Sequence, residues 1–218
     1  WLHNENLSIL IDCSADFRQQ ALNHEISRLD AILLTHTHRD DVGGLYDIRN
    51  DSPEHIPVYV QASQAKQLKQ VFYYFFEPLL QEGGGIPKIE LRELSHAESF
   101  SVKGVRVKPL LAYHGILPVL GFQWGNMAYF TDVKSMPVST VSVLRGIDVL
   151  VINSLRHRPH KTHMNIEETL ELIERISPKK TILIHTTHEL EYETTNKSLP
   201  KNVEMGYDGL ELTTDLII

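Results

Sequence analysis

The hydrophobic and polar positions of the chain change period along its length, and each period predicts a different element. Short apolar runs with polar flanks predict strands over 7–12, 29–36 and 57–60. The apolar spacing over 61–76 suits a helix. Strict alternation over 99–132, with turn residues inside it, predicts antiparallel strands.

The last third of the chain alternates strand and helix patterns. Apolar runs predict strands over 148–153 and 180–186, with a helix over 166–176 between them and a hairpin over 203–212. Strands in meanders followed by β-α alternation indicate two sheets that face each other with helices outside. The predicted fold class is therefore α/β, as a four-layer αββα sandwich in a single domain over 1–218.

The predicted helix of this region has a start and a stop signal. Asn165 can cap the first turn, and Glu168, three residues later, can reach back in a capping box. Because the residue before a proline is driven out of the α conformation, the helix should end before Pro178.

Length and composition are those of an ordinary soluble globular protein. The 218 residues are 42% hydrophobic and 22% charged, which is enough for one substantial core. No apolar run approaches the ~20 residues of a membrane-spanning helix. No basic and apolar leader is visible, and the single cysteine, Cys13, excludes an intrachain disulfide framework. We therefore expect a cytoplasmic protein that does not bind membranes.

The net charge of −7 argues against long nucleic acid as a partner. Phosphate backbones are bound mainly by clustered lysines and arginines. A small anionic substrate remains compatible with this charge, since a metal ion or a few local cations can hold one phosphate. The 12 histidines are the compositional outlier, and they become informative where they converge with acidic residues.

The stretch THTHRDD, over 35–41, gathers two histidines and two aspartates directly after a strand pattern. At the end of a strand, His36, His38 and Asp40 can fold around one centre. Imidazole with carboxylate suits zinc, manganese or iron. A polar surface loop is the alternative, since such a pattern also arises by chance.

Three further residues of ligand type end apolar strands, namely His114, Asp132 and His185. The C-terminal ends of strands are where α/β proteins place their sites. Each residue alone would more often be an incidental strand end than a ligand. Their recurrence favours one shared site.

These motifs carry a family resemblance that covers nearly the whole chain. THTHRDDVGGL, YHG, YFTDV and LIHTTHEL, in this order, resemble the metallo-β-lactamase fold superfamily, whose motif is His-x-His-x-Asp-His followed by a His, an Asp and a His. LIDCS resembles that family's first motif, in which the aspartate, here Asp12, orients the metal loop. HGILPVLGF, INSLRHRPHKTHMNIEETLELI and GYDGLEL are similar to the phosphodiesterase branch that contains phosphoribosyl 1,2-cyclic phosphate phosphodiesterase.

The resemblance implies a dinuclear metal centre. The implied ligands are His36, His38 and His114 for one metal, Asp40 and His185 for the second, and Asp132 as the bridge. Two divalent ions, Zn²⁺ or Mn²⁺ with iron as a further option, would share a water, lower its pKa and stabilise both oxygens of an in-line displacement. The implied activity is hydrolysis of a small cyclic phosphate or nucleotide-like diester, by a homodimer.

The segment LRHRPHKTHMN would, by itself, be a solvated basic loop. In the resembling phosphodiesterases a histidine here assists the leaving group, and His163, next to the helix start, fits best. The candidate catalytic residues are therefore His163 and Asp40, with Arg156 and Arg158 as candidate phosphate contacts. Cys13 is then expected to be a core residue, and the aromatic run over 71–76 to be core or a subunit interface.

The chain departs from the family pattern at Asp41, where the family has the histidine that completes the second metal site. Asp41 could ligate directly, ligate through water or leave the position open, and an added carboxylate favours manganese or iron over zinc. The alternatives to a phosphodiesterase are therefore a catalytically impaired metal-binding protein of the same fold and a hydrolase of another ester or thioester. We also expect the family's N-terminal strands to be missing, together with cysteines that could share a structural zinc with His188.

Overall fold

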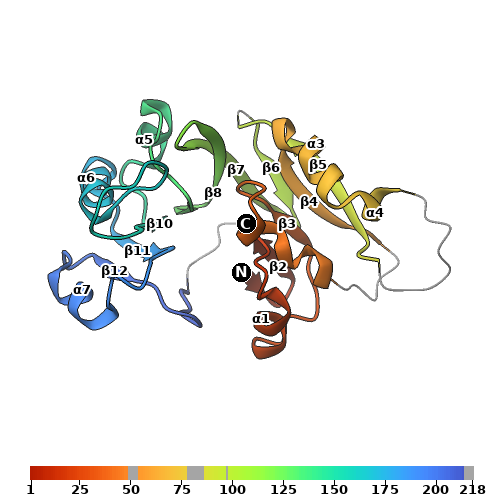
Figure 1. Ribbon diagram of the computed structural model, residues 1–218, viewed down its shortest axis with the longest axis horizontal. Helices are drawn as coiled ribbons and strands as arrows, with labels where there is room; N and C mark the ends of the chain where they lie inside the picture. Colours follow the sequence, from red (N-terminus) through yellow and green to blue (C-terminus); the bar gives the residue numbers. More distant parts are fainter. Residues whose placement is uncertain (49–53, 78–85, 97, 214–218) are drawn as a thin grey trace. The chain divides into compact units, whose positions relative to one another are not determined.

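The structure is a computed structural model that describes residues 1–48, 54–77, 86–96 and 98–213. It divides into two compact units, 1–98 and 99–218. Each unit is built around one sheet (Figure 1). The mixed α/β class with two sheets is confirmed, whereas the single domain over 1–218 stays a prediction.

The first unit contains a five-stranded sheet in the order β1-β2-β3-β4-β5. Its strands are β1 (Leu2–Asn4), β2 (Leu7–Ile11), β3 (Ala31–Leu33), β4 (Ile56–Gln61) and β5 (Ile89–Leu94). β1 and β2 are antiparallel, and the other neighbours are parallel. The strands predicted near 7–12, 29–36 and 57–60 are confirmed, although β3 is shorter than predicted.

The helices of the first unit follow strands β2, β3 and β4. They are α1 (Phe17–Asn23), α2 (Arg39–Val42), the 3-10 helix η1 (Gly43–Asp47), α3 (Ala62–Val71) and α4 (Tyr73–Phe76). α3 contacts β4 and β5 (Figure 1). The buried apolar side chains of this unit form one core, which includes Cys13, Phe17 and Ile32. The expected core position of Cys13 is thus confirmed.

The helix predicted over 61–76 was wrong at Phe72, where the backbone leaves the helix with φ −107° and ψ 35°. The side chain of Phe72 is only 1% exposed, and its ring centre lies 4.8 Å from that of Tyr46. Burial of this ring outweighs the helical propensity of the run. Phe72 is therefore a core residue, whereas Tyr73 is exposed, and a subunit interface in this run stays a prediction.

The second unit contains a seven-stranded sheet in the order β12-β11-β10-β9-β8-β7-β6. Its strands are β6 (Phe100–Val102), β7 (Val105–His114), β8 (Leu117–Trp124), β9 (Met127–Tyr129), β10 (Val149–Asn153), β11 (Lys180–Ile184) and β12 (Val203–Met205). β6 to β9 form the predicted antiparallel meander, and β9 to β12 are parallel.

The hairpin predicted over 203–212 was wrong. β12 pairs in parallel with β11, and no strand follows it among the described residues up to 213. The Gly206 N–H donates to the Leu183 carbonyl, and the Leu210 N–H donates to the Tyr207 carbonyl in a turn. The backbone groups of β12 therefore pair with β11 instead of with a second hairpin strand.

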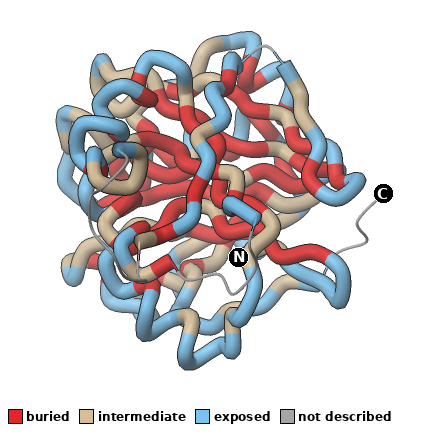
Figure 2. Tube along the Cα trace, turned by 90° about the vertical axis from the view of Figure 1, so that its right-hand side faces the viewer, coloured by how far each residue is buried: buried red, intermediate tan, exposed pale blue. Residues whose placement is uncertain are grey.

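Three helices complete the second unit, namely α5 (Val138–Leu144), α6 (Ile166–Ile176) and α7 (Tyr192–Ser198). The buried faces of α5 and α6 share one core with β7 to β12. Figure 2 shows the buried stretches in red and the exposed turns in pale blue. No helix of the described residues is long and apolar enough to cross a membrane.

The predicted capping box of α6 is confirmed. The Asn165 side chain accepts from the Glu168 N–H, and the Glu168 carboxylate accepts from the Asn165 N–H, both at 3.0 Å. α6 ends at Ile176, before Pro178 as predicted, with Ser177 in the left-handed conformation. Lys134 also pairs with Glu168 at 2.6 Å. This network anchors the N-terminus of α6 next to His163.

We expect Asn165→Ala to lower the free energy of unfolding by about 1 to 2 kcal/mol, because it removes a helix cap. Asn165 is 2% exposed, and its amide also donates to the His157 carbonyl at 2.9 Å. Urea unfolding would measure the loss. Asn165→Ser keeps a capping oxygen and should cost less. Equal losses for the two variants would show that the cap is not the source of the stability.

Candidate metal centre

In the first unit, Asp12, Thr35 and His36 form a hydrogen-bonded chain where β2 and β3 end. The Thr35 N–H donates to Asp12 Oδ1 at 2.8 Å, and the Thr35 hydroxyl donates to Asp12 Oδ2 at 3.0 Å. The hydroxyl has then used its single hydrogen, so it must accept from His36 Nδ1, 3.1 Å away. The neutral His36 ring therefore carries its hydrogen on Nδ1, which is the tautomer that binds a metal through Nε2.

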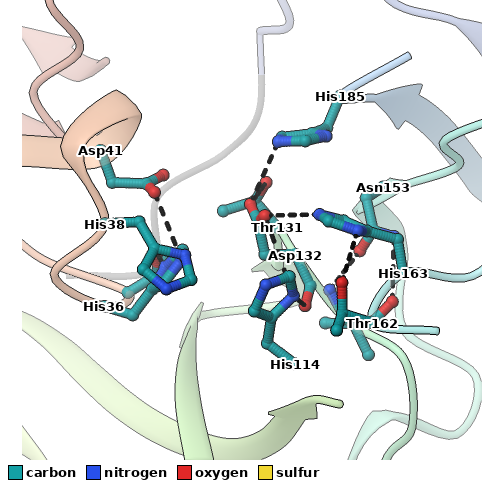
Figure 3. Close-up of polar contacts among 12 residues, drawn as sticks. His36, His38, Asp41, His114, Thr131, Asp132, Asn153, Thr162, His163 and His185 are labelled. Atoms are coloured by element: carbon teal, nitrogen blue, oxygen red, sulfur yellow. Dashed lines mark hydrogen bonds and ion pairs between the residues drawn. The ribbon is translucent and has the colours of Figure 1, made fainter. Parts of the chain in front are cut away.

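His36, His38 and Asp41 lie close together in this unit (Figure 3). His36 Nε2 is 2.9 Å from His38 Nδ1 and 3.4 Å from Asp41 Oδ2. His36 and Asp41 are buried, whereas His38 and Asp40 are exposed. The acid that approaches His36 is therefore Asp41, the residue that departs from the family pattern. The ligand role of Asp40 stays a prediction.

Asp41 is anchored through its backbone at the N-terminal end of α2. Its carbonyl accepts from the Cys13 N–H at 2.7 Å, and its N–H donates to the His38 carbonyl at 3.1 Å. Close packing at Gly44 supports this region, because a Cβ there would lie 2.0 Å from the Ser14 carbonyl oxygen. A side chain at position 44 would push apart the two segments that carry Asp12 and Asp41.

In the second unit, His114 ends β7 and Asp132 follows β9 (Figure 3). His114 Nδ1 lies 2.9 Å from the Asp132 carbonyl oxygen, which can only accept, so Nδ1 donates, and in the neutral ring Nε2 then carries no hydrogen. The Asp132 side chain is 3% exposed. In their neutral forms His114 and His36, in separate units, are thus both in the tautomer that binds a metal through Nε2.

A histidine ring nitrogen lies next to each oxygen of the Asp132 carboxylate. Oδ1 lies 2.8 Å from His163 Nε2, and Oδ2 lies 3.4 Å from His185 Nε2. The Thr131 hydroxyl also donates to Oδ2 at 2.8 Å. The ligand atoms of His114, Asp132 and His163 lie within 4.8 Å of one another, as in a group that can hold a metal ion. The structure thus gathers the four residues of this unit that were predicted to act together.

Asp12, Asp132 and His185 each have a positive φ, of 54°, 58° and 53°. Residues other than glycine rarely adopt this left-handed conformation, although Asp and His tolerate it better than most. Each of the three directly follows a strand or lies within three residues of its end. Such strained backbone recurs at functional sites because it turns a side chain sharply out of the strand direction.

Several supporting residues were missed by the sequence analysis, most clearly Asn153 at the end of β10. This buried amide accepts from the Val133 N–H at 2.7 Å and donates to the Val133 carbonyl at 3.0 Å. It thereby fixes the backbone directly after Asp132. The signal was available, because Asn153 is a polar residue at an apolar strand end, like Asp132 and His185. Thr35, Thr131 and His160 were missed as well.

Arg156 and Arg158, the predicted phosphate contacts, interact with the protein itself in the structure. Arg158 pairs with Glu189 at 2.6 Å, and Arg156 donates to the Pro159 carbonyl at 3.3 Å. The hydrogen bonds that Arg158 donates to the Glu189 carboxylate raise the pKa of Arg158. Both side chains thus stabilise the loop that carries His163. Phosphate contact stays a prediction. His188, at which no structural zinc was expected without the family's cysteines, is exposed.

The ligand types and tautomers fit divalent metal ions. Neutral imidazoles and carboxylates are the donors that zinc, manganese and iron take in hydrolytic sites. Each unit contributes such donors, and in their neutral forms both rings that can be assigned carry their hydrogen on Nδ1.

The two-sheet α/β architecture, with histidine and aspartate donors at strand ends, defines the class of metallo-β-lactamase fold hydrolases. The model of the beta-lactamase superfamily domain matches residues 8–186, and the chain belongs to this superfamily. The resemblance found in the sequence is therefore confirmed.

Two solved structures are similar to this chain over most of its length. The crystal structure of a diphosphatase from the PhnP family is 33% identical, covers 98% of this chain and 83% of that one, and has a TM-score of 0.90. The metallo-beta-lactamase fold protein YhfI from Bacillus subtilis is 14% identical, covers 95% and 88%, and has a TM-score of 0.75, which supports the fold alone.

A further relative is named for a different activity. An octanoyltransferase of Porphyromonas gingivalis (strain ATCC BAA-308 / W83) is 38% identical over 210 residues, which make up 95% of this chain and 42% of that protein. This chain thus spans about two fifths of the length of that relative.

Proposed function

We propose that this chain is a metal-dependent phosphodiesterase that hydrolyses small cyclic phosphates or nucleotide-like diesters. The observation that carries the proposal is the contact between His163 Nε2 and Asp132 Oδ1 at 2.8 Å. It brings a potential proton donor to a potential metal ligand, which is the combination that cleavage of a poor phosphorus leaving group requires. The 33% identical diphosphatase supports a phosphorus substrate.

The proposed ligands are His36, His38, Asp40 and Asp41 from the first unit, and His114, Asp132 and His185 from the second. When bound, divalent metal ions supply Lewis acidity that activates water and neutralises charge on phosphoryl oxygens. Asp12, through Thr35, keeps His36 in its ligating tautomer. The Asp132 carbonyl does the same for His114.

His163 is the proposed proton donor to the leaving oxygen. It lies two residues before the cap of α6, and its side chain is 12% exposed. A ring in this position is shielded from bulk water yet adjacent to the ligand group. The helix N-terminus behind it favours a negatively charged phosphate.

Octanoyl transfer, the activity named for the Porphyromonas gingivalis relative, has less support in this chain. Acyl transfer through a covalent intermediate needs an activated nucleophile, such as a thiolate. Cys13, the only cysteine of the sequence, is 1% exposed. Burial, followed by the charges of Asp12 and Asp47, raises the pKa of its thiol, so the reactive thiolate is disfavoured.

The proposal predicts that protein reconstituted with Mn²⁺ hydrolyses bis(p-nitrophenyl) phosphate or a 2′,3′-cyclic nucleotide. A nucleoside diphosphate ester would test the diphosphate bond in parallel. His38→Ala should abolish hydrolysis, whereas His24→Ala, a change of an exposed histidine on the first unit, should not. Absence of hydrolysis with Mn²⁺, Zn²⁺ and Fe²⁺ would instead support the impaired metal-binding alternative.

The metal preference should depend on Asp41. Because a carboxylate suits harder ions than an imidazole does, we expect about two Mn²⁺ but only about one Zn²⁺ per chain after equilibration and desalting. Asp41→His should raise the zinc content, and Asp16→His, a change of an exposed acid, should leave it unchanged. Elemental analysis checks both. Identical metal content in wild type and Asp41→His would show that Asp41 does not ligate.

A further inference from the structure

The ring of His163 has a second polar contact, at the nitrogen opposite the one that faces Asp132. His163 Nδ1 lies 3.0 Å from His160 Nδ1 and 3.1 Å from the Thr162 hydroxyl oxygen. The two histidine ring centres are 4.9 Å apart. Neither the metal-ligand assignment nor the proposed proton donor accounts for this pair.

The surroundings of His160 decide which of the two Nδ1 atoms donates. The backbone N–H of Thr162, which can only donate, points to His160 Nδ1 at 3.4 Å. Burial, then the charges of His163, Arg156 and Lys134, lower the pKa of His160, which favours a neutral ring with one accepting nitrogen. His160 Nδ1 is therefore an acceptor, and the hydrogen in the contact belongs to His163 Nδ1.

The loop that carries both histidines is tied at several points. The Asn165 amide donates to the His157 carbonyl, and Arg156 donates to the Pro159 carbonyl. The loop also lies against Gly115, next to His114, where an added Cβ would come within 3.0 Å of the Thr162 methyl group. These contacts hold the loop backbone on both sides of His160, the segment in which the hydrogen bond between His160 and His163 lies.

We propose that His160 is a positioning residue that accepts a hydrogen bond from His163 Nδ1 and thereby directs His163 Nε2 to the reaction. The inference rests on the proposed role of His163 as proton donor. The acid is then the imidazolium form of His163: the Nδ1 hydrogen stays in the hydrogen bond to His160, the Nε2 proton passes to the leaving oxygen, and the ring becomes neutral. A second histidine thus does for His163 what the orienting third member of a catalytic triad does for its base.

The kinetic test compares two leaving groups. p-Nitrophenolate leaves without a proton, whereas the ribose alkoxide of a 2′,3′-cyclic nucleotide needs one. His160→Ala should lower kcat about tenfold for the cyclic nucleotide and less than about twofold for bis(p-nitrophenyl) phosphate, the size expected for an orienting partner. His160→Asn, whose amide oxygen can accept near the Nδ1 position, should restore most of the rate. His157→Ala is the control from the same loop.

An NMR measurement that does not depend on enzymatic activity tests the role of His160 separately from the proposed function. The hydrogen-bonded ring N–H of His163 should give a low-field proton resonance that disappears in His163→Gln and His160→Ala and persists in His160→Asn and His157→Ala. If the wild type hydrolysed no phosphodiester, the proposed function would fail while this resonance still tested the pairing. Equal rate losses for both substrates, or a resonance that persists in His160→Ala, would overturn the role of His160.

Discussion

Asp132→Asn is expected to lower kcat for phosphodiester hydrolysis by roughly 10³-fold, because a metal-bound site contributes several kcal/mol to the transition state. Asp132 is the residue of the second unit that contacts both His163 and His185. Asparagine keeps the size of the side chain and tolerates the left-handed φ of 58°, so the backbone should be preserved. The change removes the carboxylate charge that would bind a cation.

The control for this variant is Asp148→Asn, which removes an exposed carboxylate that pairs with Lys179 on the surface of the same unit. Both variants should unfold at similar urea concentrations, and only Asp132→Asn should lose bound metal in elemental analysis. An Asp132→Asn enzyme with full metal content and a rate near that of the wild type would refute the ligand assignment.

The candidate ligands could be proposed from the sequence because the proposal depends on residue type and on position at a strand end. His36, His114, Asp132 and His185 each follow a hydrophobic run that predicts a strand, and the structure places the last three next to His163. The strands, the meander and the capping box of α6 follow from local periodicity in the same way. Predicting these features requires no knowledge of which distant residues come into contact.

The supporting contacts were not predictable, because they join residues whose proximity the fold creates. Asn153 and Val133 are twenty positions apart and meet only where β10 lies alongside the segment after β9. The break at Phe72 arises from ring burial against Tyr46, which overrides a continuous helical pattern. The tautomers of His36 and His114 likewise depend on neighbours that a residue pattern does not specify.

The left-handed backbone at Asp12, Asp132 and His185 combines a feature that the sequence predicts with one that only the fold determines. A residue pattern indicates that a ligand follows a strand, but the direction of its side chain depends on a conformation that tertiary contacts impose. Asn153 binds both backbone groups of the residue after Asp132, and the Asp12 N–H donates to the Leu33 carbonyl of the neighbouring strand. At Asp12 and Asp132, these hydrogen bonds help to hold the backbone in the left-handed conformation.

His163→Gln is expected to lower kcat about 10² to 10⁴-fold for a 2′,3′-cyclic nucleotide, the range typical of general acid catalysis. For bis(p-nitrophenyl) phosphate the loss should be much smaller, because p-nitrophenolate is a stable anion. Glutamine can still donate a hydrogen bond to Asp132 from its amide, so the ligand group and the metal content should be retained. The measurement is the ratio of the two rates, with elemental analysis of each preparation.

The ratio separates proton donation from metal binding. If His163 were instead a metal ligand, as its proximity to His114 and Asp132 allows, His163→Gln would lose metal and slow both substrates alike. If it donates the proton, metal content stays constant and only the alkoxide leaving group suffers. The same ratio in Asp132→Asn should remain near that of the wild type, since loss of the metal affects both substrates, and this contrast assigns the two residues to different steps of the reaction.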